Sequence, residues 1–585
     1  MMSKISTSHY ALTRLIGAVT LFLLLISAQL SAQISGTLTD AETGETLIGA
    51  TVIIQGTSVG TVTDIDGRYE VMANPGDVLV FSFTGYTNQE ITVGSETEIN
   101  VMLSAGVLVE EVVVTGYATQ RKRDITGAVA VVNAEDMNTY SAASFAQKLE
   151  GRASGLNIHT SGEPGEGSVV RIRGISSFQN NDPLYIIDGV PVQDAFNTGF
   201  NPNDIESIQV LKDAASASIY GARANNGVII VTTKQGSKGA PRITYDAYVG
   251  VTGPAHNMDF MIKDPVDYSN YVWDRHENAG LDIDASSPYS VGRGQFPAYI
   301  FPFPGTVNEA DYSFPDNIII RTNPEGTDWF DEIFDPALVM EHNLGVSGGG
   351  ENSSYYLSAS YTDQNGAMIH NYFRRFSLRA NSSFNLGPVT IGENISLSRS
   401  RRVGNDEAGG GNQDEQGIMS NLSRVHTLIP VFDVGGNAGG AKNSGMSGSN
   451  DVFGLMRNKD NIGTFYRILG NAFIEVDIIE GLRARSSFGI DFANNFQQGF
   501  NFPVYENRQP NTTNSFRESW QNIYNWTWTN TLTYNRVFAE RHNFQILGGY
   551  ESIKNSNRTL NGSIANYFTT DINAWYVNGG LADPD

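Results

Sequence analysis

The chain contains no cysteine, which excludes disulfide frameworks, zinc–thiolate sites and thiol nucleophiles. The same absence excludes a lipid anchor on an N-terminal cysteine. Basic residues are scarce: 38 Lys and Arg stand against 62 Asp and Glu, which gives a formal net charge of −24. Because nucleic acid binding requires a basic surface, no nucleic acid partner is expected.

Signals of catalysis and of metal binding are also lacking. The chain has no His-Glu-x-x-His motif and no P-loop, and its eight histidines are dispersed along the sequence. Gly162–Gly167 is a Gly-rich turn, and Asp64–Gly67 lacks the remaining ligand spacing of a calcium loop. The sequence therefore predicts no enzyme, no cofactor and no metal site.

One strongly apolar run is present, close to the N-terminus. Leu15–Ile26 follows a weakly basic lead with Lys4 and Arg14 and precedes the small, polar stretch Ser27–Gln33. The run is shorter than the ~20 residues of a membrane-spanning helix, so it predicts a cleavable signal peptide over 1–32 rather than a single membrane anchor. The cut is expected near Ala32 or Gln33.

The rest of the chain is rich in the residues of strands and turns. It holds 61 Gly and 10% aromatics in 585 residues, a length that indicates several domains. Residues 34–105 alternate short strands with turns, including a hairpin signal at Asp66-Gly67, and predict a small β-sandwich. Gly49–Val52 and Thr63–Tyr69 resemble the carboxypeptidase regulatory-like domain, a resemblance that implies the fold and no peptidase activity.

A second unit, predicted over 124–236, mixes strands, tight turns and short helices. Ile172–Gly174, Pro183–Pro191, Glu206–Ser216 and Ile219–Val228 follow one another in the order found in the plug domain of TonB-dependent transporters, and resemble the SusC/RagA subfamily. We expect a tight turn at Asp188-Gly189 and a close backbone approach at Gly174. The residues that carry the plug resemblance are Arg171, Arg173, Gly174, Tyr185, Asp188, Gly189, Pro191, Tyr220 and Gly221.

Between these units lies a short β-branched segment. It comprises Val109, Glu110, Glu111, Val112, Val113, Val114, Thr115, Gly116 and Tyr117. Stiff β-branched residues favour a strand, and a strand in a linker offers an edge that another protein's sheet can pair with. The segment resembles a TonB box, the peptide that a periplasmic energy-coupling protein grips. The alternative is a terminal strand of the preceding domain.

The third unit, 241–585, repeats an alternation of apolar and polar residues. Ile243, Tyr245, Ala247, Val249 and Val251 carry one face of the first such stretch, and roughly ten strands of this kind are predicted. One apolar face and one polar face, with Tyr and Trp among the apolar residues, are typical of transmembrane β-barrel strands. A soluble β-sandwich or propeller is the alternative. Long polar insertions at 254–338 and 400–464 are expected to be extracellular loops.

The predicted fold class is therefore dominated by β-structure: an N-terminal sandwich, an α+β plug and the first half of an antiparallel transmembrane barrel. The resemblance implies about 22 barrel strands, so the chain is expected to be a fragment of a longer protein. It further implies an outer-membrane location, a TonB-type coupling protein, a SusD-like surface lipoprotein and a glycan or peptide substrate. The competing hypothesis is a surface-exposed binding or adhesion barrel without active transport.

Overall fold

The computed structural model describes residues 32–577 with gaps, in two compact units: residues up to Val113 with Gln120–Asp124, and Val114–Thr119 with the residues from Ile125. The predicted signal peptide lies outside the described residues except for Ala32. The gaps are 42, 58, 105–111, 116–117, 122–127, 138–141, 143, 161, 179, 193–198, 214–216, 256–258, 405–421, 441, 443–445, 447–459, 507–509, 511, 539–541 and 568.

The first unit is a sandwich of two small sheets, as predicted. One sheet has the order β4-β1-β7 and the other the order β3-β2-β5-β6. Alternating side chains of both sheets, such as Leu38, Tyr69 and Phe81, are buried between them. The strands are β1 (Ala32–Asp40), β2 (Thr51–Ile54), β3 (Gly60–Val62), β4 (Arg68–Ala73), β5 (Val78–Ser82), β6 (Gln89–Thr92) and β7 (Val101–Leu103).

Two local motifs of this unit have structural explanations. Asp66-Gly67 is a turn, but the hairpin expected there is wrong, because β3 and β4 belong to different sheets. The Asp64 carboxylate accepts hydrogen bonds from the backbone of Asp66 and Arg68 at 2.9 and 2.8 Å, so it shapes this turn. Gly56–Gly60 matches Gly-x-Ser-x-Gly, yet it connects two strands, whereas a nucleophile elbow connects a strand to a helix.

The linker contains two short strands. β8 (Val112–Thr115) and β9 (Ala118–Arg121) form a two-stranded sheet of their own. Val109, Glu110, Glu111, Gly116 and Tyr117 lie outside the described residues. The central part of the TonB-box-like segment is therefore extended, and β9 is its one sheet partner in the described part of the chain.

The plug region of the second unit has a five-stranded sheet of order β10-β15-β16-β13-β14 and a separate pair, β11 and β12. Its short helix α3 (Phe145–Leu149) begins with a capping box between Ser144 and Gln147 and buries Phe145 and Leu149 against the sheet. The other elements are β10 (Val129–Asn133), α2 (Ala134–Met137), β11 (Leu156–His159), β12 (Val169–Ile172), β13 (Leu184–Ile187), β14 (Val190–Val192), η2 (Pro202–Asp204), β15 (Ile205–Leu211), η3 (Ser218–Ala224) and β16 (Val228–Thr233).

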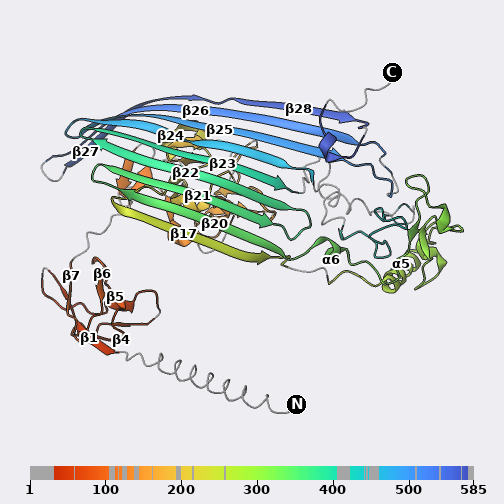
Figure 1. Ribbon diagram of the computed structural model, residues 1–585, viewed down its shortest axis with the longest axis horizontal. Coiled ribbons are helices and arrows are strands. Elements are labelled where there is room, and N and C mark those ends of the chain that lie inside the picture. The colour runs from red at the N-terminus through yellow and green to blue at the C-terminus, as the bar shows by residue number, and fades with distance from the viewer. Residues whose placement is uncertain are drawn as a thin grey trace, which may run out of the picture. The chain divides into compact units, whose positions relative to one another are not determined.

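Next comes a large antiparallel sheet in which each strand pairs with the next along the chain (Figure 1). β27 and β28 pair with successive stretches of β26 in one unbroken register, Trp526 with Lys554 and Ile523 with Asn557, so they form a single line. The strands are β17 (Gly239–Thr252), β20 (Ala337–Gly349), β21 (Ser353–Asn365), β22 (Tyr372–Leu386), β23 (Val389–Val403), β24 (Gly463–Ile479), β25 (Leu482–Asn501), β26 (Ser515–Phe538), β27 (His542–Lys554) and β28 (Asn557–Ala565).

The large sheet is open and its two faces differ. Within the described residues, its edges β17 and β27–β28 do not pair with each other. One face presents apolar residues in cross-strand rows, for example the exposed Leu357 and Ile395 on either side of the half-buried Ala380, and the other face presents polar residues to the plug. This alternation confirms the sequence prediction of one apolar and one polar face.

The connections at one end of the large sheet are short, and those at the other end include two long ones. Residues expected to be mere polar insertions fold together into a lobe with its own core, which includes Tyr289, Ile318, Trp329, Leu428 and Ile429. The amide of Thr327 and its hydroxyl donate to the carbonyls of Thr427 and Ile429 at 2.8 and 2.6 Å, which joins the two loops. The lobe contains α5 (Pro265–Ala279), η4 (Pro288–Val291), β18 (Tyr299–Phe301), η5 (Glu309–Asp311), β19 (Ile320–Arg321) and α6 (Trp329–Ile333).

Candidate functional site

The turn between β13 and β14 is the centre of the contact between plug and large sheet. Ile187 pairs with Val190, so Asp188 and Gly189 form a two-residue hairpin turn with φ of 46° and 86°. Positive φ angles at both central residues are typical of a type I′ hairpin turn, which the pair Asp-Gly favours. The tight turn expected at Asp188-Gly189 is present. The close approach expected at Gly174 is wrong, because a Cβ there would meet open space; its φ of 99° is what requires glycine.

Asp188 connects the plug to three neighbouring strands of the large sheet. Its carboxylate accepts hydrogen bonds from the amide and hydroxyl of Thr233 at 3.0 and 2.6 Å, which fixes it within the plug. From the large sheet, Arg379 of β22 donates at 3.2 Å and Asn394 of β23 also donates to the carboxylate. Asn471 of β24 donates to the Asp188 carbonyl at 2.5 Å. The Arg379 side chain is 1% exposed, so this is a buried, charge-assisted contact.

A second group of contacts lies along residues 199–204, just before β15. The carbonyl of Gly199 accepts from the Ser398 hydroxyl at 2.7 Å, and that of Phe200 from Arg375 at 3.0 Å. Asp204 accepts from the hydroxyl of Ser358 at 2.6 Å. Burial raises the pKa of Asp204 above its usual range, against the opposing effect of the nearby Arg379 charge. The sequence analysis did not identify this segment as a contact site. A run such as Asn-Pro-Asn-Asp shows neither the two-residue alternation of a strand nor the 3.6-residue repeat of a helix.

Lys148 of α3 belongs to the same buried group. Its ammonium donates to the Asn203 side chain at 2.8 Å, and the Asn203 amide donates to Glu341 of β20 at 2.6 Å. Burial lowers the pKa of Lys148 to about 8, with Glu341 acting in the opposite direction. The plug–sheet interface thus holds charges of both signs away from water.

Partly exposed ion pairs flank the buried contacts. Arg402 of β23 pairs with Glu163 at 2.9 Å, in the turn that the sequence identified as Gly-rich. Arg223 of η3 pairs with Glu551 of β27 at 2.8 Å. The neighbouring motif residues Tyr220 and Gly221 also lie in η3, where Gly221 has a φ of 66° and Tyr220 is buried.

The remaining plug-motif residues act within the plug. Arg171 forms an ion pair with Asp182, and Arg173 adopts a φ of 57°. Tyr185 is buried edge-to-face against Phe145, with 5.7 Å between ring centroids, and Pro191 lies in β14 opposite Ile186. Among the predicted motif residues, Asp188 hydrogen-bonds to the large sheet through its side chain.

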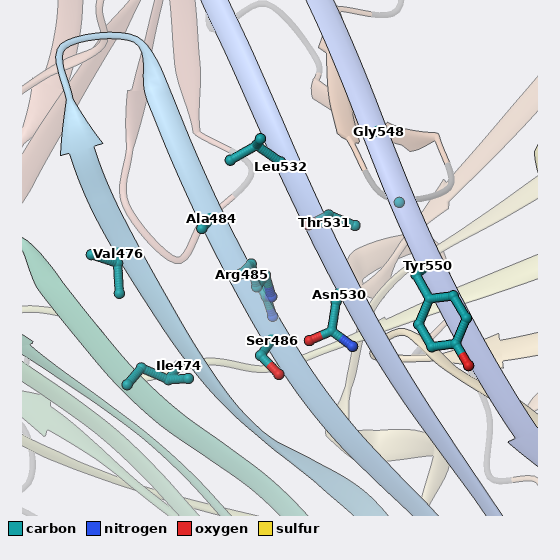
Figure 2. A pocket seen from close by; sticks show the side chains of 11 residues that line it. Ile474, Val476, Ala484, Arg485, Ser486, Asn530, Thr531, Leu532, Gly548 and Tyr550 are labelled. Atoms are coloured by element: carbon teal, nitrogen blue, oxygen red, sulfur yellow. The ribbon is translucent and has the colours of Figure 1, made fainter.

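A cavity of about 520 Å³ lies on β24 to β27 (Figure 2). Ile474, Ser486, Asn530 and Tyr550 form one cross-strand row of its lining, on the apolar face of the sheet, which lies opposite the plug. It is therefore a groove in the surface that faces lipid rather than a site in the lumen. The other lining residues are Val476, Ala484, Arg485, Thr531, Leu532, Gly548 and Gly549.

The described residues contain no group of three or more His, Cys, Asp or Glu with the geometry of a metal site. They also contain no helix that is both long enough and apolar enough to span a membrane.

Comparison with known proteins agrees with this architecture. Residues 121–228 match the TonB-dependent receptor plug domain, and residues 34–114 match the CarboxypepD_reg-like domain, a match that extends into the TonB-box-like segment. TonB-dependent receptor P26 of Formosa agariphila is 33% identical over 89% of this chain and 49% of its own length. TonB-dependent receptor SusC of Bacteroides thetaiotaomicron is 34% identical over 61% of this chain and 32% of its own length.

Among solved structures, the RagAB peptide importer in its open-open state superposes with a TM-score of 0.65. That comparison has 25% identity and covers 81% of this chain and 52% of that one. The chain thus spans about half the length of the curated relatives it matches, or less.

A plug held by polar contacts on one face of an antiparallel sheet, with exposed apolar side chains on the other, defines a TonB-dependent receptor of the outer membrane. Within that class, the two domain matches, the receptor SusC and the RagAB importer make the chain similar to the SusC/RagA family. The family consists of receptors and transporters rather than enzymes.

Proposed function

We propose that this chain is part of a transporter that imports a bulky nutrient, an oligosaccharide or a peptide, across the outer membrane. The observation that carries the proposal is the polar, partly charged interface between plug and sheet. Such an interface can be rehydrated, so a plug seated through it can move without exposing a large apolar surface. The RagAB complex, described as a peptide importer, supports peptides as one substrate class.

The driving force is proposed to arrive through Val109–Tyr117. The outer membrane has no ion gradient of its own, so work must be transmitted from the inner membrane by a TonB-type protein. β8 is extended and pairs with β9 alone in the described part of the chain, which leaves its other edge for strand addition. A SusD-like lipoprotein is the proposed surface partner, and a signal peptide ending near Ala32 the proposed export signal.

The Val113→Pro variant of the complete protein tests this coupling. Proline removes a backbone donor from β8 and blocks strand pairing. We expect uptake of the substrate to fall to the level of a strain without the coupling protein, while binding at the cell surface stays unchanged. Val113→Thr, which keeps a β-branched side chain, is the matched control and should import normally.

The alternative function, a surface-binding or adhesion barrel, makes a different prediction for the same strains. It has no need of coupling, so wild type and both variants should bind alike and none should accumulate substrate. Normal uptake by Val113→Pro would remove the coupling role from β8. A variant that loses surface binding as well would point to misfolding, and surface protease accessibility separates that case.

A further inference from the structure

Three arginines cluster on the lipid-facing side of β22 and β23. Arg374 and Arg401 are directly opposite each other in the strand pairing, and Arg399 lies two residues from Arg401 on the same face. Directly opposed residues of an antiparallel pair have Cβ atoms about 5 Å apart, and like charges in such pairs are destabilising. A membrane protein that keeps this arrangement needs an anion beside it.

The side on which these arginines lie follows from the alternation of the strands. Arg399 and Arg401 share their face with Leu397, which is exposed, whereas the next residue, Arg402, points inward to Glu163 of the plug. On β22, Arg374 likewise alternates with Arg375, which is buried and donates to Phe200 of the plug. The cluster therefore projects away from the lumen.

The protein itself supplies little compensating charge. Arg374 pairs with Asp363 of β21 at 3.2 Å, and its side chain remains 48% exposed. Arg399 lies over the ring of Tyr466, with 5.7 Å between its guanidinium carbon and the ring centroid. This cation–π contact does not neutralise the positive charge of Arg399. Across the described residues neither Arg399 nor Arg401 has an ion pair, so three cations face one carboxylate.

The cluster lies at one boundary of the apolar band. On β22 the outward residues from Phe376 to Leu386 cover about 33 Å along the strand, which at the usual tilt spans a height of roughly 25 Å. Arg374 is the next outward-facing residue beyond Phe376, at the end of the sheet where the long connections leave. In barrels of this kind the long connections are extracellular. Tyr361 and Tyr466 lie in the same cross-strand row as Arg399 and resemble an aromatic girdle.

We infer that Arg374, Arg399 and Arg401 form a binding site for a phosphate-bearing lipid headgroup of the outer leaflet. Guanidinium groups bind phosphate through paired hydrogen bonds, and basic residues at a membrane boundary attract anionic headgroups. The acyl chains would lie on the apolar band below, beside Phe376 and Leu397. The site is independent of the proposed import and would exist in a barrel that transports nothing.

The test compares the complete protein with its Arg399→Gln/Arg401→Gln variant, both extracted in mild detergent. The probe is bisphosphorylated lipid A, and native mass spectrometry measures the lipid retained per protein. We expect the double variant to retain at least fivefold less lipid than wild type. Arg558→Gln is the matched control, because Arg558 is exposed in the same cross-strand row on β28 and no described arginine lies beside it.

Two further arms identify the ligand. Dephosphorylated lipid A should be retained equally and weakly by wild type and double variant. Inorganic phosphate at millimolar concentration should displace little of the bound lipid. Equal retention of the phosphorylated lipid by wild type and double variant would overturn the site. So would displacement by phosphate alone, which would mark a soluble-anion site, or a change of oligomeric state without a change in lipid, which would assign the cluster to a protein partner.

Discussion

Asp188 shows how one residue of a recognised motif acquires its role from partners that are distant in sequence. The Asp-Gly pair predicts a turn, and the turn is present with both residues at positive φ. The carboxylate then contacts Arg379 and Asn394, which lie 191 and 206 residues later in the chain. The sequence around Asp188 does not predict these partners, because Arg379 and Asn394 come together only when the strands of the large sheet are in register.

Replacing Asp188 by Ala should release the plug. The change leaves Arg379 buried without its carboxylate, and removing one partner of a buried ion pair typically costs about 3–5 kcal/mol. We expect cells producing the variant of the complete protein to become sensitive to large antibiotics that the outer membrane normally excludes, as measured by growth inhibition.

The matched control is Asp182→Ala, which removes a plug carboxylate that is 48% exposed in its pair with Arg171. An exposed pair is worth about 0–1 kcal/mol, so exclusion should be unchanged. Intact exclusion by Asp188→Ala at wild-type surface levels would show that the 199–204 contacts hold the plug without this turn.

At the scale of elements, alternation in the sequence predicted the large sheet well. The alternating stretch from Ile243 to Val251, for example, lies within the observed strand β17 (Gly239–Thr252). The alternation of apolar and polar residues is visible in the sequence because each strand has one face toward lipid and one toward the lumen. The loop lobe could not be predicted in this way, because its core is assembled from short elements of two loops, joined by contacts such as that of Thr327 with Ile429.

Trp329→Ala should loosen the loop lobe and leave the large sheet intact. Trp329 is 4% exposed in the lobe core, and a cavity of this size typically costs about 3–5 kcal/mol. We expect the loops after β17 and β23 to be cleaved by added protease at least tenfold faster in whole cells. Phe432→Ala, at a lobe residue that is 58% exposed, is the control. Equal cleavage rates for wild type and Trp329→Ala would show that the lobe does not depend on this core.

At the scale of the whole molecule, the large sheet of the described residues has two edges. β17 and the β27–β28 line each carry a row of backbone groups that no described strand pairs with. In lipid, each such group costs several kcal/mol, so membrane-spanning sheets must close. This is the physical basis for the sequence expectation that further strands accompany these.

Expression of these 585 residues alone should therefore fail to give a membrane barrel. We expect the product to aggregate or to be degraded, because exposed edges and apolar rows such as Trp528 and Leu532 would meet water. Gel mobility with and without boiling measures barrel formation, and a full-length family member serves as the positive control. A heat-modifiable, protease-resistant band from this chain would mean that its edges can pair.

The distribution of the plug's partners bears on the order of assembly. Its hydrogen bonds reach β20 to β24, and an ion pair reaches β27, so strands that emerge early from the translocation machinery already contain a binding surface for it. A barrel that grows strand by strand can therefore enclose its plug as it forms. The plug then does not have to enter a finished pore. A partly formed sheet that has already bound the plug is also stabilised by these contacts while the remaining strands are added.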